Sequence, residues 1–436
     1  MEYIKRYWRP ERGEYPALLK RGIGRTSANR EAVQAILEGV KERGDSALLE
    51  YSRRFDGVEL SSLRVTDSEI EEASALVDVS LKQALRTAQQ NIETFHRAQL
   101  PTGEQVERDG IELWRKVVPI ERVGLYVPGG TAPLVSTVLM LALPARVAGC
   151  HSIALCTPPG KDGRVDPAIL WAANAVGVDE IYKVGGAQAI GAMAYGTETI
   201  GAVDKIYGPG NSWVTEAKSQ VGSTVCAIDL PAGPSEVMVA VTPASDPLFV
   251  AADLLSQAEH GRDSQAMLVV RAGKKEGFAF IDRVEEAIGM LATRLERSGE
   301  IEASLTNSRA FVIPSTEEMA ALINAYAPEH LIISLASGEE DEYLLSRVHN
   351  AGSVFLGPWS PESSGDYASG TNHTLPTAGW ARSYSGLSVD SFVKKITVQR
   401  LNKDALVDLA PTVVAMADVE GLGAHRLAVD VRLEER

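Results

Sequence analysis

Short runs of β-branched and other apolar residues recur along this chain, and each run is followed by Gly, Pro or a helical pattern. This alternation is typical of βαβ units, in which a helix connects two parallel strands. One group of runs lies at 122–127, 152–156, 180–184 and 205–207, and a second group lies at 266–270, 310–313, 331–334 and 353–356. The pattern therefore predicts an α/β protein with two parallel-sheet domains.

The predicted boundaries divide the chain into four parts. A single core rarely extends over 436 residues, so more than one domain is expected. Residues 27–99 have apolar positions at helical spacing, as in Val33, Leu37 and Val40. The four parts are an N-terminal segment, a first α/β domain in two pieces, a second α/β domain and a helical C-terminal tail, over 1–25, 26–125 with 237–385, 126–236, and 386–436.

Composition argues against nucleic acid and membranes as partners. The chain has 43 Lys and Arg residues against 58 Asp and Glu residues, and its net charge of -15 opposes binding to phosphate backbones and anionic lipids. The best candidate for a membrane span, 132–148, contains Pro144 and Arg146 and falls short of the roughly 18 uninterrupted apolar residues required, so it predicts a buried helix.

The cysteines carry little structural information. Only Cys150, Cys156 and Cys226 are present, without CxxC spacing, so neither a disulfide framework nor a thiolate zinc site is indicated. The N-terminus has no apolar run of signal-peptide length. A reducing compartment fits both observations, and we expect a cytoplasmic protein.

A pair of candidate metal ligands lies near the end of a predicted helix. Asp246 and Pro247 form a helix start, and Gly261 closes the helix. The spacing of Gln257 and His260 places their side chains about 60° apart on one face, where both can reach one metal ion. Alternatively, His260 is a capping or surface residue, which is the more frequent case near helix C-termini.

The segment 361–377 is rich in loop-forming residues and dense in ionisable groups. Such loops often surround sites, although ordinary surface loops have the same composition. Asp366 could supply an oxygen ligand, and His373 could supply a nitrogen donor or a substrate contact.

Glu329 and His330 place a carboxylate beside an imidazole just before a predicted strand. Histidine suits proton transfer near neutral pH, and a neighbouring carboxylate can tune it or activate water. Adjacent residues of a strand point to opposite faces, so both can serve one site only if the chain turns there. As a bare dipeptide, the pair is not diagnostic.

Two Gly-rich turns follow predicted strands, at Pro128-Gly-Gly130 and Gly208-Pro-Gly-Asn211. Backbone N–H groups in such turns can approach a phosphate, although plain βα turns look the same. Neither turn matches the dinucleotide fingerprint GxGxxG. A third segment, 420–425, precedes the last predicted helix and has the composition of a helix cap with a surface histidine.

Taken together, these segments resemble the histidinol dehydrogenase family from the helical N-terminal region to the end of the chain. The resemblance rests on the number and order of the blocks rather than on any one of them. The blocks are VGLYVPGGTAPL from Val123, VGGAQAI from Val184, IYGPGN from Ile206, LPAGPSE from Leu230, DLLSQAEHG from Asp253, APEHL from Ala327 and GDYASGTNH from Gly365.

The resemblance implies a zinc-dependent enzyme that oxidises L-histidinol to L-histidine through L-histidinaldehyde, with reduction of two NAD, as the last step of histidine biosynthesis. It also implies a homodimer with shared active sites. One zinc would be held by three ligands of one subunit and by His425 of the partner subunit, and nitrogen and oxygen donors suit zinc. The three ligands are Gln257, His260 and Asp366.

The resemblance further implies the roles of other residues. His330 is the implied general base, and Glu329 is implied to activate water. Positions that match substrate contacts are Ser235, Gln257, His260, Glu329, His330, Asp366, His373, Glu420 and His425. Positions that match NAD contacts are Tyr126, Gln188 and Asn211.

The fold implied by the resemblance is a pair of Rossmann-like domains without the GxGxxG fingerprint, with helical terminal segments swapped across the dimer. The domain of 26–125 with 237–385 would carry the metal and catalytic residues, and 126–236 would form the NAD side.

Two other functions stay open. One is an NAD- and zinc-dependent dehydrogenase of another small alcohol, for example a sulfonated diol; against it, a sulfonate would be expected to call for a cation where Glu420 stands. The other is a catalytically silent zinc-stabilised dimer or regulatory binding protein, against which the presence of His330, Glu329 and the implied ligands argues.

Overall fold

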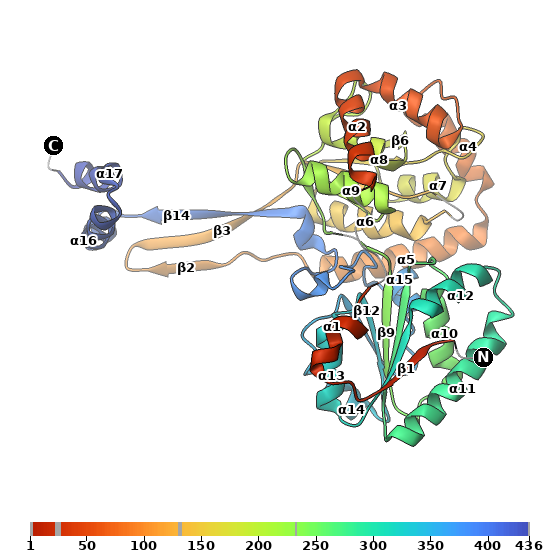
Figure 1. Cartoon of the computed structure of the whole chain (residues 1–436). Helices are drawn as coiled ribbons and strands as arrows, with labels where there is room; N and C mark the ends of the chain where they lie inside the picture. The colour runs from red at the N-terminus through yellow and green to blue at the C-terminus, as the bar shows by residue number, and fades with distance from the viewer. Residues whose placement is uncertain (1–2, 22–27, 130–132, 232, 435–436) are drawn as a thin grey trace.

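The computed structural model describes residues 3–21, 28–129, 133–231 and 233–434. Within these ranges the chain forms two parallel sheets, each flanked by helices, and a long arm that carries a pair of helices away from them (Figure 1). All eight predicted strand runs are strands. The prediction of an α/β fold with parallel sheets is therefore confirmed.

The first sheet has five parallel strands in the order β6-β5-β4-β7-β8. Its strands are β4 Arg122–Tyr126, β5 Ser152–Thr157, β6 Glu180–Lys183, β7 Lys205–Tyr207 and β8 Ala227–Ile228. The chain runs outward from β4 to β6 and then returns to the other side of β4. In open α/β sheets, such a reversal creates a crevice at the carboxyl ends of the strands, where ligands bind.

Helices cover both faces of this sheet, with α4, α5, α6 and α7 on one face and α2, α3, α8 and α9 on the other. Besides α6, their bounds are α2 Ala28–Arg43, α3 Asp45–Tyr51, α4 Asp67–Leu76, α5 Val79–Arg97, α7 Pro167–Ala175, α8 Gly186–Tyr195 and α9 Ser212–Gly222. The described part of the predicted helical region is helical, but it packs on the five-stranded sheet. This packing differs from the expected grouping of 26–125 with 237–385, because helical spacing shows which face is buried and not which sheet buries it.

Helix α6, Val135–Ala148, corresponds to the apolar stretch that the sequence analysis assigned to a buried helix. Its residues from Ser136 to Ala145 are buried, and the helix packs against α5 and β4. The prediction is confirmed for this part, while 132 lies outside the described residues. No helix in the described ranges combines the length and apolar character that a bilayer span needs.

The second sheet has six parallel strands in the order β1-β11-β10-β9-β12-β13. Its strands are β1 Lys5–Trp8, β9 Glu236–Val241, β10 Gln265–Arg271, β11 Arg309–Ile313, β12 His330–Ser334 and β13 Ser353–Leu356. Strand β9 is not among the predicted strands; its six residues are all buried and show no polar alternation. Strand β1 shows that the N-terminal segment joins its own chain's sheet.

Helices cover both faces of the second sheet as well, with α10, α11 and α12 on one face and α1, α13 and α14 on the other. The bounds are α1 Tyr15–Leu18, α10 Pro247–Ala258, α11 Lys274–Ala292, α12 Ser298–Asn307, α13 Thr316–Tyr326 and α14 Gly338–Leu345. Shorter helices are η1 Arg12–Glu14, η2 Ser52–Asp56, α15 Glu362–Tyr367, η3 Trp380–Arg382 and η4 Val389–Phe392.

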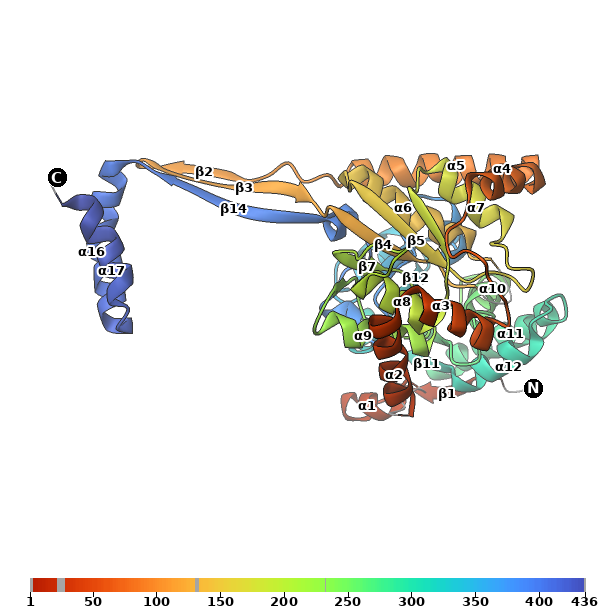
Figure 2. The same cartoon turned by 90° about the horizontal axis from the view of Figure 1, so that it is seen from above.

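An antiparallel arm of three strands, in the order β14-β3-β2, projects from the two domains (Figure 2). Its strands are β2 Gln105–Arg108, β3 Ile111–Pro119 and β14 Val393–Leu401, and helices α16 Lys403–Glu420 and α17 Gly423–Leu433 lie at its tip. The predicted helical tail over 386–436 is thus corrected, because it includes β14. This strand is largely solvated on both faces, so its sequence lacks the alternation of a half-buried strand.

Candidate active site

Helix α10 positions the predicted ligands Gln257 and His260. Asp246 caps the helix by accepting a hydrogen bond of 2.8 Å from the backbone N–H of Leu248, as its sequence predicts. Gln257 is fully buried, and neither its amide oxygen nor its amide nitrogen has a hydrogen-bond partner among the described residues. His260 lies two residues beyond the last helical residue, Ala258, and is exposed.

A short helix, α15, carries Asp366 and a second carboxylate, Glu362. The composition of 361–377 predicts a loop, but the first part of this segment is helical. The four-residue spacing places Glu362 and Asp366 on one helix face. Candidate ligand atoms of these residues and of His260 all lie within 4.8 Å of one another. Glu362 was missed, although its spacing from Asp366 is a signal that the sequence contains.

Glu329 and His330 lie at the start of β12, next to the start of β9. The backbone N–H of Glu236 donates a hydrogen bond of 2.8 Å to Oε2 of Glu329. The backbone oxygen of the same residue lies 3.3 Å from Nδ1 of His330. One residue of β9 therefore holds both side chains, and the parallel pairing of β9 with β12 makes this possible. Glu329 lies at a bend just before the strand, which meets the condition set above for both side chains to serve one site.

Three carboxylates surround the buried imidazole of His330. Its Nδ1 lies 3.7 Å from Glu329 Oε2 and 3.8 Å from Glu362 Oε1. Its Nε2 lies 3.3 Å from Asp366 Oδ1, although these two atoms are not aligned as a hydrogen bond. Burial lowers the pKa of His330, but Glu362, Glu329 and Asp366 outweigh that effect and raise the pKa to about 10. The cluster therefore favours a positive charge at its centre.

The same surroundings shift the pKa values of the three carboxyl groups in different directions. Burial raises the pKa of Glu329 to about 8 and that of Glu362 to about 7. Burial also acts to raise the pKa of Asp366, but the facing His330 outweighs it, so this pKa lies below its ordinary value. Groups whose pKa values are moved this far by burial and by specific partners are typical of functional sites.

His373 joins the cluster to the other domain. Its Nδ1 lies 3.0 Å from the backbone oxygen of Asp366, and its Nε2 lies 3.3 Å from the hydroxyl oxygen of Thr137 on α6. Ser235 directly precedes β9 and is half-buried. The structure thus places His373 against the metal-ligand candidate Asp366, and Ser235 at the end of β9 nearest to Glu329.

Two predicted site residues are not brought to the cluster within the chain. Glu420 ends α16, and His425 lies in the first turn of α17, both at the tip of the arm and both exposed (Figures 1 and 2). The arm separates them from the two sheets. Within one chain, the structure therefore brings His260, Asp366, Glu329 and His330 together without these two.

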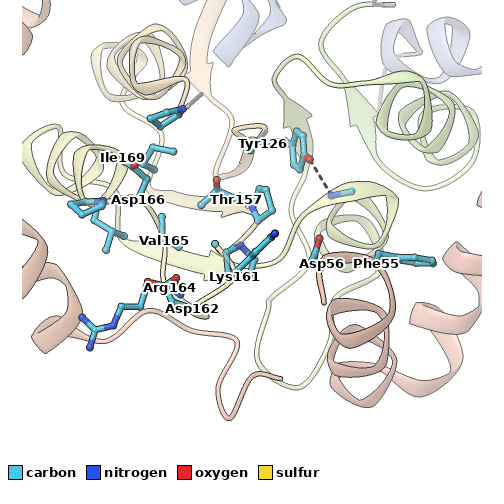
Figure 3. Close-up of a pocket in the computed structure, with 18 of the residues that line it drawn as sticks. Phe55, Asp56, Tyr126, Thr157, Lys161, Asp162, Arg164, Val165, Asp166 and Ile169 are labelled. Carbon is cyan, nitrogen blue, oxygen red and sulfur yellow. Dashed lines mark hydrogen bonds between the residues drawn. The ribbon is translucent and has the colours of Figure 1, made fainter. Parts of the chain in front are cut away.

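A cavity of about 1070 Å³ lies at the carboxyl end of the five-stranded sheet. The predicted NAD contacts Tyr126, Gln188 and Asn211 all line it. The Tyr126 hydroxyl accepts a hydrogen bond of 3.0 Å from the backbone N–H of Gly186, as Figure 3 shows. The cavity is lined by the ends of β4 and β5 and by the first residues of α8 and α9, so it lies at the carboxyl end of the sheet, where α/β proteins bind ligands. The described turn residue Gly208 also approaches Tyr126; Gly130 lies outside the described residues.

Gly208 makes that close approach possible. Its φ of +123° is in the left-handed region, and a Cβ atom there would lie 2.1 Å from the backbone oxygen of Tyr126. A larger residue would therefore clash with β4 and strain the backbone. The close packing of this βα turn against β4 is therefore the reason for a glycine at position 208.

Asp56, at the end of η2, also lines the cavity and was missed by the sequence analysis (Figure 3). Its Oδ2 is buried without a hydrogen-bond partner in the described part of the chain, and burial raises the pKa of this carboxyl to about 6. The residue lies in a charged helical region with no motif, so its role depends on how the helix packs on the sheet.

The family model for histidinol dehydrogenase matches residues 19–433. The chain belongs to the histidinol dehydrogenase family. It is 52% identical to histidinol dehydrogenase from Bacteroides fragilis over 98% of each chain, and 51% identical to that from Bacteroides thetaiotaomicron over 97% of each chain.

A solved structure extends this relationship to the fold. The crystal structure of histidinol dehydrogenase from Elizabethkingia anophelis superimposes with a TM-score of 0.95 and 46% identity, covering 99% of this chain and 98% of the other. Membership of the histidinol dehydrogenase family makes this chain an oxidoreductase, and the implied pathway is histidine biosynthesis. The alternatives of another alcohol and of a silent binding protein are not favoured.

The donor atoms of the cluster fit a divalent cation. An imidazole nitrogen with carboxylate and amide oxygens is a donor set that suits zinc. The buried amide of Gln257 and the buried Oε2 of Glu362 have no partner among the described residues, which is costly for polar groups unless a ligand or ion satisfies them.

Proposed function

We propose that this enzyme uses zinc and NAD to oxidise L-histidinol to L-histidine through L-histidinaldehyde, with reduction of two NAD, as the last step of histidine biosynthesis in the cytoplasm. The observation that carries the proposal is the convergence of Glu329, His330, His260 and Asp366 in one cluster of a histidinol dehydrogenase family member.

Gln257, His260 and Asp366 would hold the zinc, with His425 of the partner subunit as the fourth ligand. When bound, zinc would act as a Lewis acid that holds the substrate's imidazole and amino nitrogens and orients its carbinol carbon. The donor set and the unpaired Gln257 amide support this assignment.

His330 is the proposed base of both oxidations. Without a cation, its three carboxylates hold a proton on the imidazole, and a bound cation would offset their charge and free the imidazole to accept a proton. Its Nδ1 proton can be donated to the backbone oxygen of Glu236, at 3.3 Å, which leaves Nε2 as the acceptor. In the first oxidation, Nε2 takes the hydroxyl proton while the hydride of the carbinol carbon goes to NAD, which yields the aldehyde. In the second oxidation, it takes a hydroxyl proton of the hydrated aldehyde while the second hydride reduces another NAD.

Glu329 would activate the water that adds to the aldehyde between the two oxidations. It is buried and held by the backbone N–H of Glu236, so its carboxylate has a defined orientation. The same enclosed position keeps bulk water away, so the amino aldehyde is converted in place before it can react elsewhere.

The remaining contacts are proposed from the family match and from position. Ser235 and His373 border the cluster, and Glu420 of the partner subunit would supply a carboxylate that pairs with the basic substrate. Tyr126, Gln188 and Asn211 would bind NAD in the 1070 Å³ cavity. The cavity lies at the end of the five-stranded sheet where α/β proteins bind nucleotides.

We propose a homodimer whose subunits exchange their tails. The tail exposes apolar side chains that a monomer would leave in water, namely Val407, Met416, Val419, Leu422 and Leu427. Such a surface is typical of a contact with another protein. A second copy that covers it would also bring His425 and Glu420 to a site from which the arm separates them in one chain.

The deciding experiment is to measure NADH and histidine formed by purified enzyme from L-histidinol and NAD. The expected result is two NADH per histidine, with turnover lost on chelation and recovered with zinc. Activity with sulfonated or other amino alcohols in place of L-histidinol would contradict the proposed substrate. Full activity after verified removal of the metal would contradict the proposed cofactor.

A further inference from the structure

Glu362 is the strongest unexplained group of the cluster. Its side chain is 2% exposed, and its Oε2 has no hydrogen-bond partner among the described residues. Its other oxygen lies 3.8 Å from Nδ1 of His330, which is too long for a hydrogen bond. A carboxylate that is buried and incompletely paired is costly, so a binding partner outside the chain is indicated.

The position of Glu362 makes a cation the natural partner. One of its oxygens lies within 4.8 Å of ligand atoms of both His260 and Asp366. Glu362 and Asp366 lie on the same face of α15, one turn apart, as paired ligands do. Gln257, one turn before His260 on α10, has a buried amide oxygen that is also unpartnered.

Charge supports the same conclusion. Three carboxylates, those of Glu329, Glu362 and Asp366, face the single imidazole of His330. One imidazolium can offset only one of these three negative charges, and carboxylates crowded in a buried site repel one another. A divalent cation beside Glu362 and Asp366 would balance the remaining negative charge.

We propose that Glu362 is a metal ligand, so that one subunit alone offers four donors, from Gln257, His260, Glu362 and Asp366, and holds the cation before substrate or the partner's His425 reaches it. The inference rests on the proposed function for the presence of a metal at this site. The inference adds that one subunit can bind the metal without the tail of its partner.

The test compares the full-length wild type with Glu362→Gln, His425→Ala and the double variant. Each purified chain, stripped of metal, is titrated with Co²⁺ without substrate, and binding and coordination are followed in the visible d–d absorption. Zinc affinity is measured by competition with a chromophoric chelator. The matched control is Glu302→Gln, the same change at an exposed carboxylate on α12.

The expected result is that His425→Ala still binds one Co²⁺ per subunit and loses turnover. Glu362→Gln changes the Co²⁺ spectrum and weakens zinc binding by more than about tenfold, a loss that even outer-sphere partners of metal ligands can cause. The double variant loses the metal during desalting. The control matches wild type, and circular dichroism of each variant verifies that it is folded.

Two results would overturn this inference and leave the proposed function intact. One is a Co²⁺ spectrum of Glu362→Gln identical to that of wild type, which would make Glu362 a counter-charge for His330 rather than a ligand. The other is a double variant that binds metal as tightly as His425→Ala. Absence of any stoichiometric metal in the wild type would instead contradict the proposed function.

Discussion

Nε2 of His330 lies 3.3 Å from Oδ1 of Asp366, so the proposed base and a proposed metal ligand face each other directly. The two residues come from different elements, β12 and α15, which only the fold brings together. In this arrangement a proton acceptor and a metal-bound substrate would share one small volume, as proton abstraction from that substrate requires.

Removing the imidazole should slow chemistry without removing the metal. His330→Ala is expected to lower kcat by about 10²- to 10⁴-fold, the usual contribution of a general base. Zinc content should stay unchanged, because the donors are on other residues. Steady-state kinetics and metal analysis check this, with His349→Ala, at an exposed histidine, as control. A kcat of the variant near that of the control would rule out His330 as the base.

Glu329→Gln should separate the two oxidations. The amide can keep the hydrogen bond from Glu236 but cannot take a proton from water, so the first NADH forms and the second is delayed. In a single-turnover experiment we expect the second phase to slow by about 100-fold or more. Glu339→Gln, at an exposed position on α14, is the control. Equal slowing of both phases would argue against a role in water activation.

Tyr126→Phe should weaken cofactor binding. The change removes the hydroxyl that accepts the hydrogen bond from the Gly186 N–H. This backbone donor is then unpaired beside the cavity, which costs about 1–3 kcal/mol of free energy. The KM for NAD is expected to rise by about tenfold, while the KM for L-histidinol changes little. Tyr384→Phe, at an exposed ring, serves as control. An unchanged KM for NAD would place the cofactor elsewhere.

Asp56 should give cofactor binding a pH dependence. Its ionised carboxylate is suited to accept hydrogen bonds from ribose hydroxyls, and burial raises its pKa to about 6. As pH falls through about 6, the carboxylate is protonated, so the KM for NAD should rise below that pH. Measured KM values from pH 5 to 8, about the range in which such a group titrates, test this.

Asp56→Asn is the companion measurement. The variant should show a raised KM for NAD at high pH and lose the pH dependence. The folded-state pKa of about 6 lies above the ordinary value of 3.8, so ionised Asp56 destabilises the fold above pH 6. The variant should therefore have a higher Tm than wild type at pH 8 and nearly the same Tm at pH values below its ordinary pKa. An unaltered pH profile of KM would exclude Asp56 as the titrating group.

Subunit mixing tests the shared site. His330→Ala and His425→Ala chains should each be nearly inactive alone. If tails are exchanged, a mixed dimer contains one site with both histidines intact, and a random equal mixture should regain about a quarter of wild-type activity. Refolding the two chains together and assaying turnover checks this. No recovery, with mixed dimers verified by mass spectrometry, would show that both residues serve the same chain's site.

Part of the site could be predicted from local sequence. The helix that ends near Gln257 and His260 follows from its Asp-Pro start, and the structure has that helix with the predicted cap. Glu329 and His330 were identified as neighbours of a strand, but that both contact Glu236 of β9 depends on a parallel pairing between distant segments. Sequence spacing carries no information about such a pairing.

The sequence by itself determined the α/β class, the strands of both sheets except β1, β8 and β9, and membership of its family, because these depend on local periodicity and on ordered blocks of residues. Only the tertiary structure decided which sheet buries the N-terminal helices, that Glu362 joins His260 and Asp366, and that His425 lies at the tip of an arm. The physical reason is that each of these facts is a contact, or the lack of one, between segments far apart in the chain. Such contacts are selected by the packing of whole faces rather than by any local pattern.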